Sequence, residues 1–205
     1  RPELEQCDAN YAPLTPVSFL ARAARYFGDR IAVIDRERRF TYREFDTRCR
    51  RLASALSKAG VGPGDTVSVV AANILAHLEV HYAVPMLGAV LNPINIRLDA
   101  TTIAFTLEHG EAKVILADQE FHAAVKPALE QVRQTLLVID IADQETADAP
   151  KLGEIEYEDF LLQGDPDFQG PGPNNEWDPI CLLYTSGTTG NPKGAMLSHH
   201  NIAKN

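Results

Sequence analysis

Residues that could bind a phosphate group are concentrated near the end of the chain. They combine hydroxyl groups, glycines and a lysine, and they are Thr185, Ser186, Gly187, Thr188, Thr189, Gly190 and Lys193. Glycines let the backbone turn and approach a ligand closely, so that several N–H groups can point at one anion. Hydroxyl groups add hydrogen-bond donors, and the lysine adds a positive charge. The composition is therefore typical of a loop that binds a polyphosphate.

The spacing excludes two common phosphate-binding loops. A Walker-type loop requires Gly-Lys-Ser/Thr, whereas Lys193 follows Pro192 and precedes Gly194. The pattern of the protein-kinase glycine-rich loop is absent as well. The alternative to a phosphate-binding loop is a solvated hairpin tip without a ligand, because such tips are also rich in glycine and serine. The phosphate-binding pattern extends over many consecutive residues, and this length favours a ligand-binding loop over a simple hairpin tip.

The loop resembles the signature of the adenylate-forming (AMP-binding) superfamily over eleven consecutive residues, Tyr184-Thr-Ser-Gly-Thr-Thr-Gly-Asn-Pro-Lys-Gly194. That superfamily includes acyl-CoA synthetases, luciferases and the adenylation domains of peptide synthetases. Three earlier segments are similar to its N-terminal landmarks and follow the usual order, namely Phe40-Thr-Tyr-Arg-Glu-Phe45, Gly62-Pro-Gly-Asp-Thr-Val67 and Gly88-Ala-Val-Leu-Asn-Pro93. The run Asn95-Ile-Arg-Leu-Asp99 is most similar to the branch of acyl-activating enzymes that use medium-chain or short branched acids.

The resemblance implies an α/β fold with the doubly wound, mostly parallel sheets of the N-terminal domain of an adenylate-forming enzyme, incomplete in this chain. Residues 1–205 would form the N-terminal part of the large AMP-binding domain, and residues 180–205 its phosphate-loop hairpin. The family's catalytic residues, its adenine and ribose contacts and its C-terminal lid are expected beyond Asn205. We therefore expect the 205-residue chain to be inactive by itself.

The resemblance also implies an activity for the complete protein. This is an ATP-dependent carboxylic acid–CoA ligase, or acyl-CoA synthetase, of fatty acid and lipid metabolism, which forms an acyl adenylate and releases pyrophosphate. Thr185 to Gly190 and Lys193 would hold the β- and γ-phosphates, and Thr185 would contact Mg²⁺. An aryl-CoA ligase, a luciferase-like enzyme or a carrier-protein adenylation domain remain alternatives, as does a non-catalytic nucleotide-binding module.

The elements that position the loop alternate between strand and helix. Apolar runs rich in β-branched residues predict strands at Thr66–Ala72, Val90–Ile94, Val114–Ala117, Leu136–Ile139 and Ile180–Tyr184, and helical segments separate the first four. Such alternation indicates a parallel sheet covered on both faces. Asn73, Asp99 and Asp118 are expected to begin the intervening helices, and Pro85 to kink or interrupt the first of them. A last strand at Ala195–Ser198 and a helix near Asn201 would follow the loop.

The N-terminal segment predicts two helices and a hairpin. Thr15-Pro16 is a helix start for a segment that runs to Phe27, and Ile31–Asp35 with Arg39–Tyr42 predicts a hairpin. Thr41 and Glu44 have the spacing of a capping box for the next helix, which Gly60 ends. The basic residues of Arg43–Arg51 lie opposite its apolar stripe and are interpreted as a solvated face.

The connection from residue 142 to residue 179 differs in charge from the rest of the chain. Between Asp140 and Asp178 there are 12 acidic residues and one lysine, a charge of -11, while the rest of the chain carries about +2. It contains several glycines and prolines and one short helical candidate, Tyr157–Leu162. We expect an acidic surface connection. No clustered basic surface supports binding to nucleic acid.

The remaining composition is that of an ordinary globular protein. Cys7, Cys49 and Cys181 have neither disulfide-framework nor zinc-site spacing, and His199 and His200 are interpreted as structural. No apolar run approaches the roughly 18 residues of a membrane span. The sequence thus predicts a soluble, cytoplasmic protein whose partners are a carboxylic acid, ATP and CoA, and a homodimer stays open.

Overall fold

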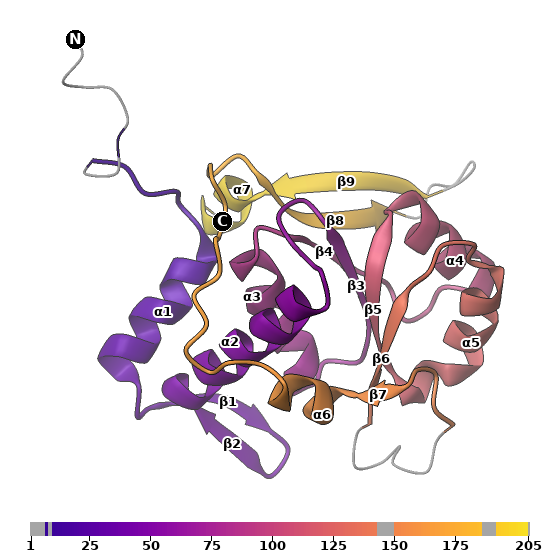
Figure 1. Cartoon of the computed structure of the whole chain (residues 1–205), viewed down its shortest axis with the longest axis horizontal. Coiled ribbons are helices and arrows are strands. Elements are labelled where there is room, and N and C mark those ends of the chain that lie inside the picture. The colour runs from indigo at the N-terminus through magenta and orange to yellow at the C-terminus, as the bar shows by residue number, and fades with distance from the viewer. Residues whose placement is uncertain (1–6, 8–9, 143–149, 186–191, 205) are drawn as a thin grey trace.

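The computed structural model describes residues 7, 10–142, 150–185 and 192–204. Its centre is a seven-stranded sheet of order β7-β6-β5-β3-β4-β8-β9 (Figure 1). The strands are β3 (Thr66–Val70), β4 (Val90–Pro93), β5 (Ala112–Asp118), β6 (Leu137–Ile141), β7 (Ile155–Glu156), β8 (Pro179–Thr185) and β9 (Lys193–Ser198). All neighbouring strands are parallel except β8 and β9, which form an antiparallel hairpin at one edge.

Helices cover both faces of this sheet (Figure 1). One face carries α2 (Tyr42–Lys58), α3 (Leu75–Met86) and α6 (Tyr157–Leu162), and the other carries α4 (Ala100–His109) and α5 (His122–Gln131). The helix α1 (Pro16–Phe27) packs outside α2 and α3. The expectation of a doubly wound, mostly parallel sheet is confirmed.

The strand sequences explain why both faces are covered. Every residue of β3 is buried, and its valines are divided between two hydrophobic clusters. Val67 and Val69 pack under α2 and α3, while Val70 packs under α4 and α5. A strand that is apolar on both sides is stable only between two layers of helices, because each side must be removed from water.

Most of the local signals have their expected outcome. Thr15 caps α1, Thr41 and Glu44 form a complete capping box, and Asp99 caps α4. The hairpin β1 (Ile31–Asp35) and β2 (Arg38–Thr41) is present, and a 3₁₀ turn, η2 (Gln119–Phe121), capped by Asp118, precedes α5. The last helix, α7 (His199–Lys204), begins two residues before Asn201.

The helix start expected at Asn73 is wrong. The N-cap of α3 is Ile74, and it makes no side-chain capping bond. The carbonyl oxygen of Ala72 accepts the Ile74 N–H at 2.9 Å, so a tight turn displaces the helix start by one residue. Pro85 lies in the last turn of α3, which ends at the next residue, Met86.

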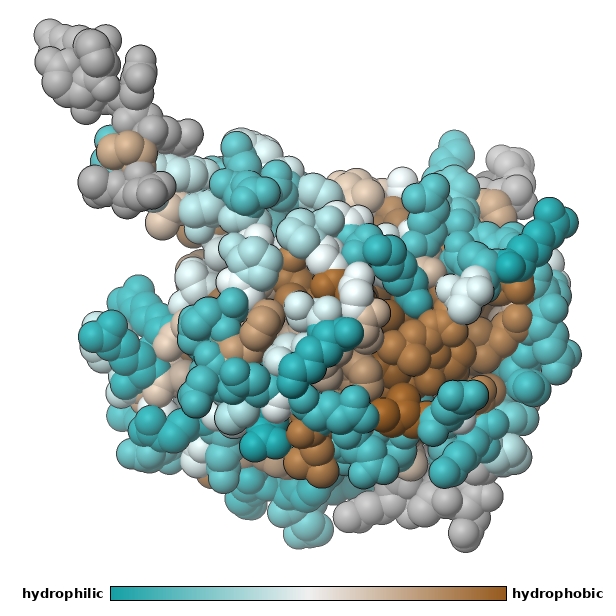
Figure 2. Space-filling model, in the orientation of Figure 1, coloured by the Kyte–Doolittle hydropathy of each residue, from teal (hydrophilic) through white to brown (hydrophobic). Residues whose placement is uncertain are grey.

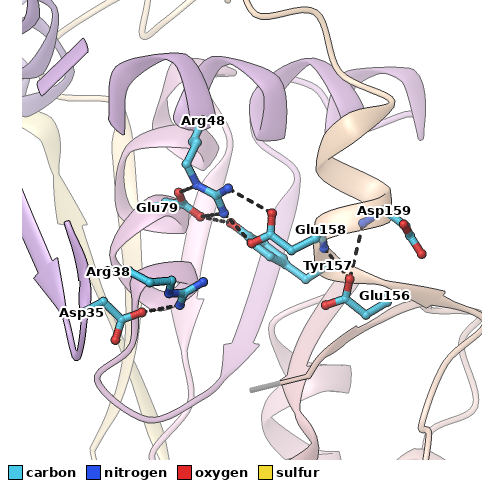
Figure 3. A network of polar contacts seen from close by, with 8 residues as sticks. All are labelled: Asp35, Arg38, Arg48, Glu79, Glu156, Tyr157, Glu158 and Asp159. Atoms are coloured by element: carbon cyan, nitrogen blue, oxygen red, sulfur yellow. Dashed lines mark hydrogen bonds and ion pairs between the residues drawn. The ribbon is translucent and has the colours of Figure 1, made fainter. Parts of the chain in front are cut away.

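The prediction of a solvated face on α2 is wrong for Arg48. Its guanidinium binds Glu79, which is 0% exposed, and also donates to Glu158 of α6 at 2.6 and 2.9 Å (Figure 3). Tyr157 donates its hydroxyl to the same Glu79 at 2.5 Å. Two further basic residues of α2, Arg50 and Lys58, donate to backbone carbonyls of the acidic connection. This side of α2 therefore binds the connection that carries most of the negative charge.

The acidic connection contains, besides the predicted helix α6, a strand that the sequence did not predict. The short strand β7 extends the sheet by pairing in parallel with β6. Asp140 accepts the backbone N–H groups of Leu152 and Gly153 at 2.8 and 3.0 Å. Side-chain bonds to backbone thus bring the chain back to the sheet after residues 143–149, which lie outside the described residues.

Gly164 is expected to tolerate no larger residue, because a Cβ built there would lie 1.9 Å from the carbonyl oxygen of Arg51. Gly164→Ala should lower the free energy of unfolding by roughly 2–3 kcal/mol, since backbone must move to relieve the overlap. Urea unfolding monitored by circular dichroism measures the change. Gly62→Ala is the matched control, because the nearest atom to its Cβ would be 3.9 Å away. Equal stability of the two variants would contradict the close approach.

Candidate functional site

The hairpin β8 and β9 brings the two ends of the predicted phosphate loop together. Tyr184 pairs with Gly194, and Thr185 pairs with Lys193. The Thr185 hydroxyl lies 3.4 Å from the Lys193 carbonyl oxygen, at the long limit for a hydrogen bond. Both side chains are exposed. The hairpin thus presents a hydroxyl and an ammonium group at the same end of two adjacent strands.

The other candidate residues, Ser186, Gly187, Thr188, Thr189 and Gly190, lie outside the described residues. The described part of the site therefore consists of Thr185 and Lys193 and the residues that support them. The strand assignments on both sides are confirmed, since β8 contains all of Ile180–Tyr184 and β9 contains all of Ala195–Ser198.

An aromatic cluster supports the end of β8. The Tyr184 hydroxyl lies 2.7 Å from Nδ1 of His109, and the two rings are nearly perpendicular at 5.7 Å. Phe105, one helical turn before His109, stacks on that imidazole at 5.2 Å and meets the Tyr184 ring edge-on at 6.4 Å. Partial burial raises the pKa of Tyr184, so the phenol stays protonated at neutral pH. Its hydroxyl can donate a hydrogen bond to Nδ1 of His109.

His109 and Phe105 were not identified from the sequence. Their spacing is an i, i+4 pair of ring residues at the end of α4, which is the only signal that could have pointed to them. Nothing in that signal shows that the pair contacts Tyr184, which is 75 residues away in the sequence. The contact depends on how α4 packs beside the sheet edge.

Gly194 has a steric role opposite Tyr184. A Cβ at this position would lie 2.9 Å from Leu182 Cδ1 and 3.6 Å from the Tyr184 ring. The missing side chain therefore makes room for Leu182, whereas a Cβ would make only an ordinary contact with the Tyr184 ring.

An apolar hollow of about 740 Å³ opens beside the hairpin, on the side of α3. Residues from α3, β8, β9 and α7 line it, including Leu78, Leu183, Leu197 and Ile202. Among the described residues that line it there is no lysine or arginine, but His77 and His81 are present. On the face seen in Figure 2, apolar surface gathers near β5 and β6, inside a hydrophilic border.

The described residues contain no group of three or more histidine, cysteine or acidic side chains able to hold a metal ion. His199 and His200 make separate contacts, with Thr15 and Glu176. A magnesium ion at the loop would nevertheless fit the exposed Thr185 hydroxyl, because Mg²⁺ commonly combines few protein oxygens with substrate phosphates and water. Within the described residues, no helix has the length and apolar character to cross a membrane.

The sheet, its two helical layers and the terminal hairpin define an α/β protein of the doubly wound class. The chain belongs to the AMP-binding enzyme family, which matches it over residues 20–205.

Curated relatives are similar to the chain in sequence, and a solved structure is similar to it in fold. The chain is 46% identical over 209 residues to "Acetate/butyrate--CoA ligase AAE7, peroxisomal" of Arabidopsis thaliana, covering 96% of this chain and 37% of the relative. It is 42% identical over 216 residues to "Trans-cinnamate:CoA ligase, peroxisomal" of Petunia hybrida, with the same two coverages. The anthranilate CoA ligase AuaEII, solved with anthranoyl-AMP, has the same fold with a TM-score of 0.83 and 22% identity, over 94% of this chain and 36% of that one. The chain thus spans little more than a third of the length of these relatives.

Proposed function

We propose that the complete protein is an ATP-dependent carboxylic acid–CoA ligase that acts through an acyl adenylate. The observation that carries this proposal is the pairing of Thr185 with Lys193 at the end of the β8–β9 hairpin, in a chain of the AMP-binding enzyme family. The names of the two CoA ligases above support the reaction class. The reaction requires no nucleophile from the protein, because the substrate carboxylate attacks the α-phosphorus of ATP.

The loop would act on the departing pyrophosphate. As the bond between the α-phosphorus and the bridging oxygen breaks, negative charge accumulates on the leaving group. Donors placed before the reaction stabilise such charge without reorganisation. We assign this role to Thr185, Ser186, Gly187, Thr188, Thr189, Gly190 and Lys193. Mg²⁺ bound by the Thr185 hydroxyl and the phosphates would neutralise further charge.

The second half of the reaction transfers the acyl group to CoA. The thiol sulfur attacks the carbonyl carbon of the acyl adenylate, and AMP leaves with the electron pair of the broken acyl–phosphate bond. In this proposal the loop from Thr185 to Lys193 binds the phosphates of the nucleotide, and the groups that activate the thiol lie in the rest of the protein. We also propose that this activity belongs to fatty acid metabolism.

For the substrate we propose a short- or medium-chain carboxylic acid. The segment from Asn95 to Asp99, which is similar to the branch that uses medium-chain or short branched acids, supports this class. The acetate and butyrate named for the Arabidopsis relative support it too. Cinnamate, named for the Petunia relative, is the aromatic alternative that an acid panel must include.

A pyrophosphate-release assay with the complete gene product tests the function. We expect release only when ATP, Mg²⁺ and a carboxylic acid are present together, and acyl-CoA only when CoA is added. The panel should contain acetate, butyrate, 2-methylpropanoate, hexanoate, benzoate and cinnamate. ATP binding without acid-dependent pyrophosphate release would favour the non-catalytic module. An adenylate that is transferred to a carrier protein and not to CoA would favour an adenylation domain.

The cellular location and the oligomeric state of the protein are predictions. We expect the cytoplasm, and the peroxisome is the alternative raised by the relatives' names. Imaging of the tagged complete gene product separates the two, and size-exclusion chromatography with light scattering tests for a homodimer.

A further inference from the structure

The end of the β8–β9 hairpin opposite the phosphate loop is held by contacts between three distant segments. We call this region the hairpin base, and it comprises Leu14, Thr15, Glu176, Trp177, Asp178, Ser198, His199 and His200. It lies where β8 begins and β9 ends, since Pro179 pairs with Ser198. Figure 1 shows α7 beside the start of α1 at this end of the hairpin. The base thus connects the hairpin to the N-terminal helix.

His199 is the buried centre of the hairpin base. Its side chain is fully buried, and Nδ1 lies 2.8 Å from the hydroxyl of Thr15, the residue that caps α1. Its backbone N–H donates to the Asp178 carbonyl at 3.1 Å. Burial lowers the pKa of His199, so the ring is neutral at neutral pH. The His199 side chain therefore joins Thr15, the cap of α1, to the first residue of α7, directly after β9.

Glu176 makes a second connection between the same segments. One carboxylate oxygen accepts from the His200 ring at 2.8 Å, and the other accepts the Leu14 N–H at 3.2 Å. The His200 N–H donates to the Glu176 carbonyl at 2.7 Å, and Trp177 stacks on the His200 ring at 4.2 Å. The Leu14 N–H and the His200 ring lower the pKa of Glu176, so the side chain is a carboxylate. Both of its oxygens are thus used to hold the base.

Apart from the base, the hairpin is held by the pairing of β8 with β4 and by the contacts of Tyr184 with His109 and Phe105 at the loop end. β8 pairs with β4 at Leu91 and Cys181, and β9 is an edge strand whose first four residues are exposed. Lys193 begins this edge strand, and Ser198, next to His199, ends it. β8 and β9 pair with each other from the base to Thr185 and Lys193, so a change of angle at the base is passed along the paired strands toward the loop end.

We propose that Glu176, His199 and His200 are positioning residues for the polyphosphate site, because the hairpin base sets the direction of the strands that carry Thr185 and Lys193. The inference rests on the proposed function, since it requires the loop to bind ATP. These three residues act through the backbone of the hairpin and touch no nucleotide. Loosening the base lets the hairpin adopt several orientations, of which only a fraction is competent to bind, and the apparent affinity falls to that fraction of the intrinsic affinity.

The test is the affinity of the complete gene product for MgATP, measured by calorimetry without acid. Glu176→Ala removes both side-chain bonds, and we expect binding about three- to tenfold weaker, the range typical of coupling through a packed network. Glu176→Gln keeps an oxygen for the Leu14 N–H and should stay closer to the parent. Glu156→Ala is the matched control, because Glu156 also accepts backbone N–H groups, but those of α6.

A second pair of variants separates positioning from general stability. His200→Asn places an amide nitrogen near the position of Nδ1 and should keep binding within about twofold of the parent, whereas His200→Leu should weaken it like Glu176→Ala. Thermal unfolding of each variant is recorded alongside. Parent affinity in both Glu176→Ala and His200→Leu would overturn the inference, as would equal weakening in Glu156→Ala. A parent protein that binds no MgATP would overturn the proposed function, and this inference with it.

Discussion

Exchanging Lys193 for alanine in the complete gene product is expected to lower kcat for acid-dependent pyrophosphate release by about 100- to 1,000-fold. Lys193 begins β9 directly opposite Thr185, so its ammonium group is presented at the end of the hairpin where the loop begins. Charge on the leaving pyrophosphate is larger in the transition state than in bound ATP. A cation at this place therefore acts more on kcat than on the KM for ATP.

Three comparisons make this measurement specific. Lys126→Ala removes another exposed lysine, on α5, whose nearest acidic partner is 3.9 Å away, and should leave kcat within twofold. Lys193→Arg keeps the charge and should retain more activity than alanine. Adding Thr188→Ala to Lys193→Ala should lower the rate further. Steady-state kinetics unchanged in the double variant would refute the assignment of the loop.

The second large effect is expected at Arg48. Arg48→Met should lower the free energy of unfolding by roughly 3–5 kcal/mol, because it leaves the Glu79 carboxylate buried without a counter-charge. Glu79 is 0% exposed and retains the Tyr157 hydroxyl as a donor (Figure 3). Glu158 is 47% exposed and loses much less when Arg48 is removed. The change is measured by urea unfolding.

The loss of unfolding free energy in Arg48→Met, called the deficit below, should depend on pH. Burial raises the pKa of Glu79 above its ordinary value of 4.5, and the Arg48 and Tyr157 contacts oppose that rise. Without Arg48 the pKa rises further, so the folded state binds a proton that the unfolded state has lost. Stability then falls as the pH rises from 4.5 through the raised pKa, and the deficit should be larger at pH 8 than at pH 5.

A second substitution tests the cause of the deficit. Glu79→Gln in the Arg48→Met background removes the buried charge, keeps an acceptor for Tyr157 and should recover part of the lost stability. The recovery of stability should be greatest at pH 8, where the single variant has lost the most stability. A deficit that is independent of pH and unaffected by Glu79→Gln would show that Arg48 contributes by packing, for example over the Phe40 ring at 5.5 Å, and not by charge.

Local patterns were sufficient to predict nearly all helices and strands, because their causes lie within a few residues. Thr41 and Glu44 satisfy each other's backbone donors across one helical turn. Gly60, with φ of 90°, follows α2 because glycine adopts positive φ without steric cost. The helix start predicted at Asn73 was wrong because a hydrogen bond between neighbouring backbone groups displaced it by one residue. The strand β7 was missed because two residues carry no periodic pattern, and it exists only by pairing with β6.

For the site, the sequence by itself predicted which residues form the phosphate loop, and it correctly predicted the strands on both sides of that loop. The types and spacing of Thr185 to Lys193 are a local property of the chain. The tertiary structure alone decided what supports the loop, since His109 reaches Tyr184 across 75 residues and Thr15 reaches His199 across 184. It also decided that Arg48 faces Glu79 and Glu158 and not water. These contacts depend on how helices pack on the sheet, and that packing is set by burial of the whole apolar surface, which no single segment specifies.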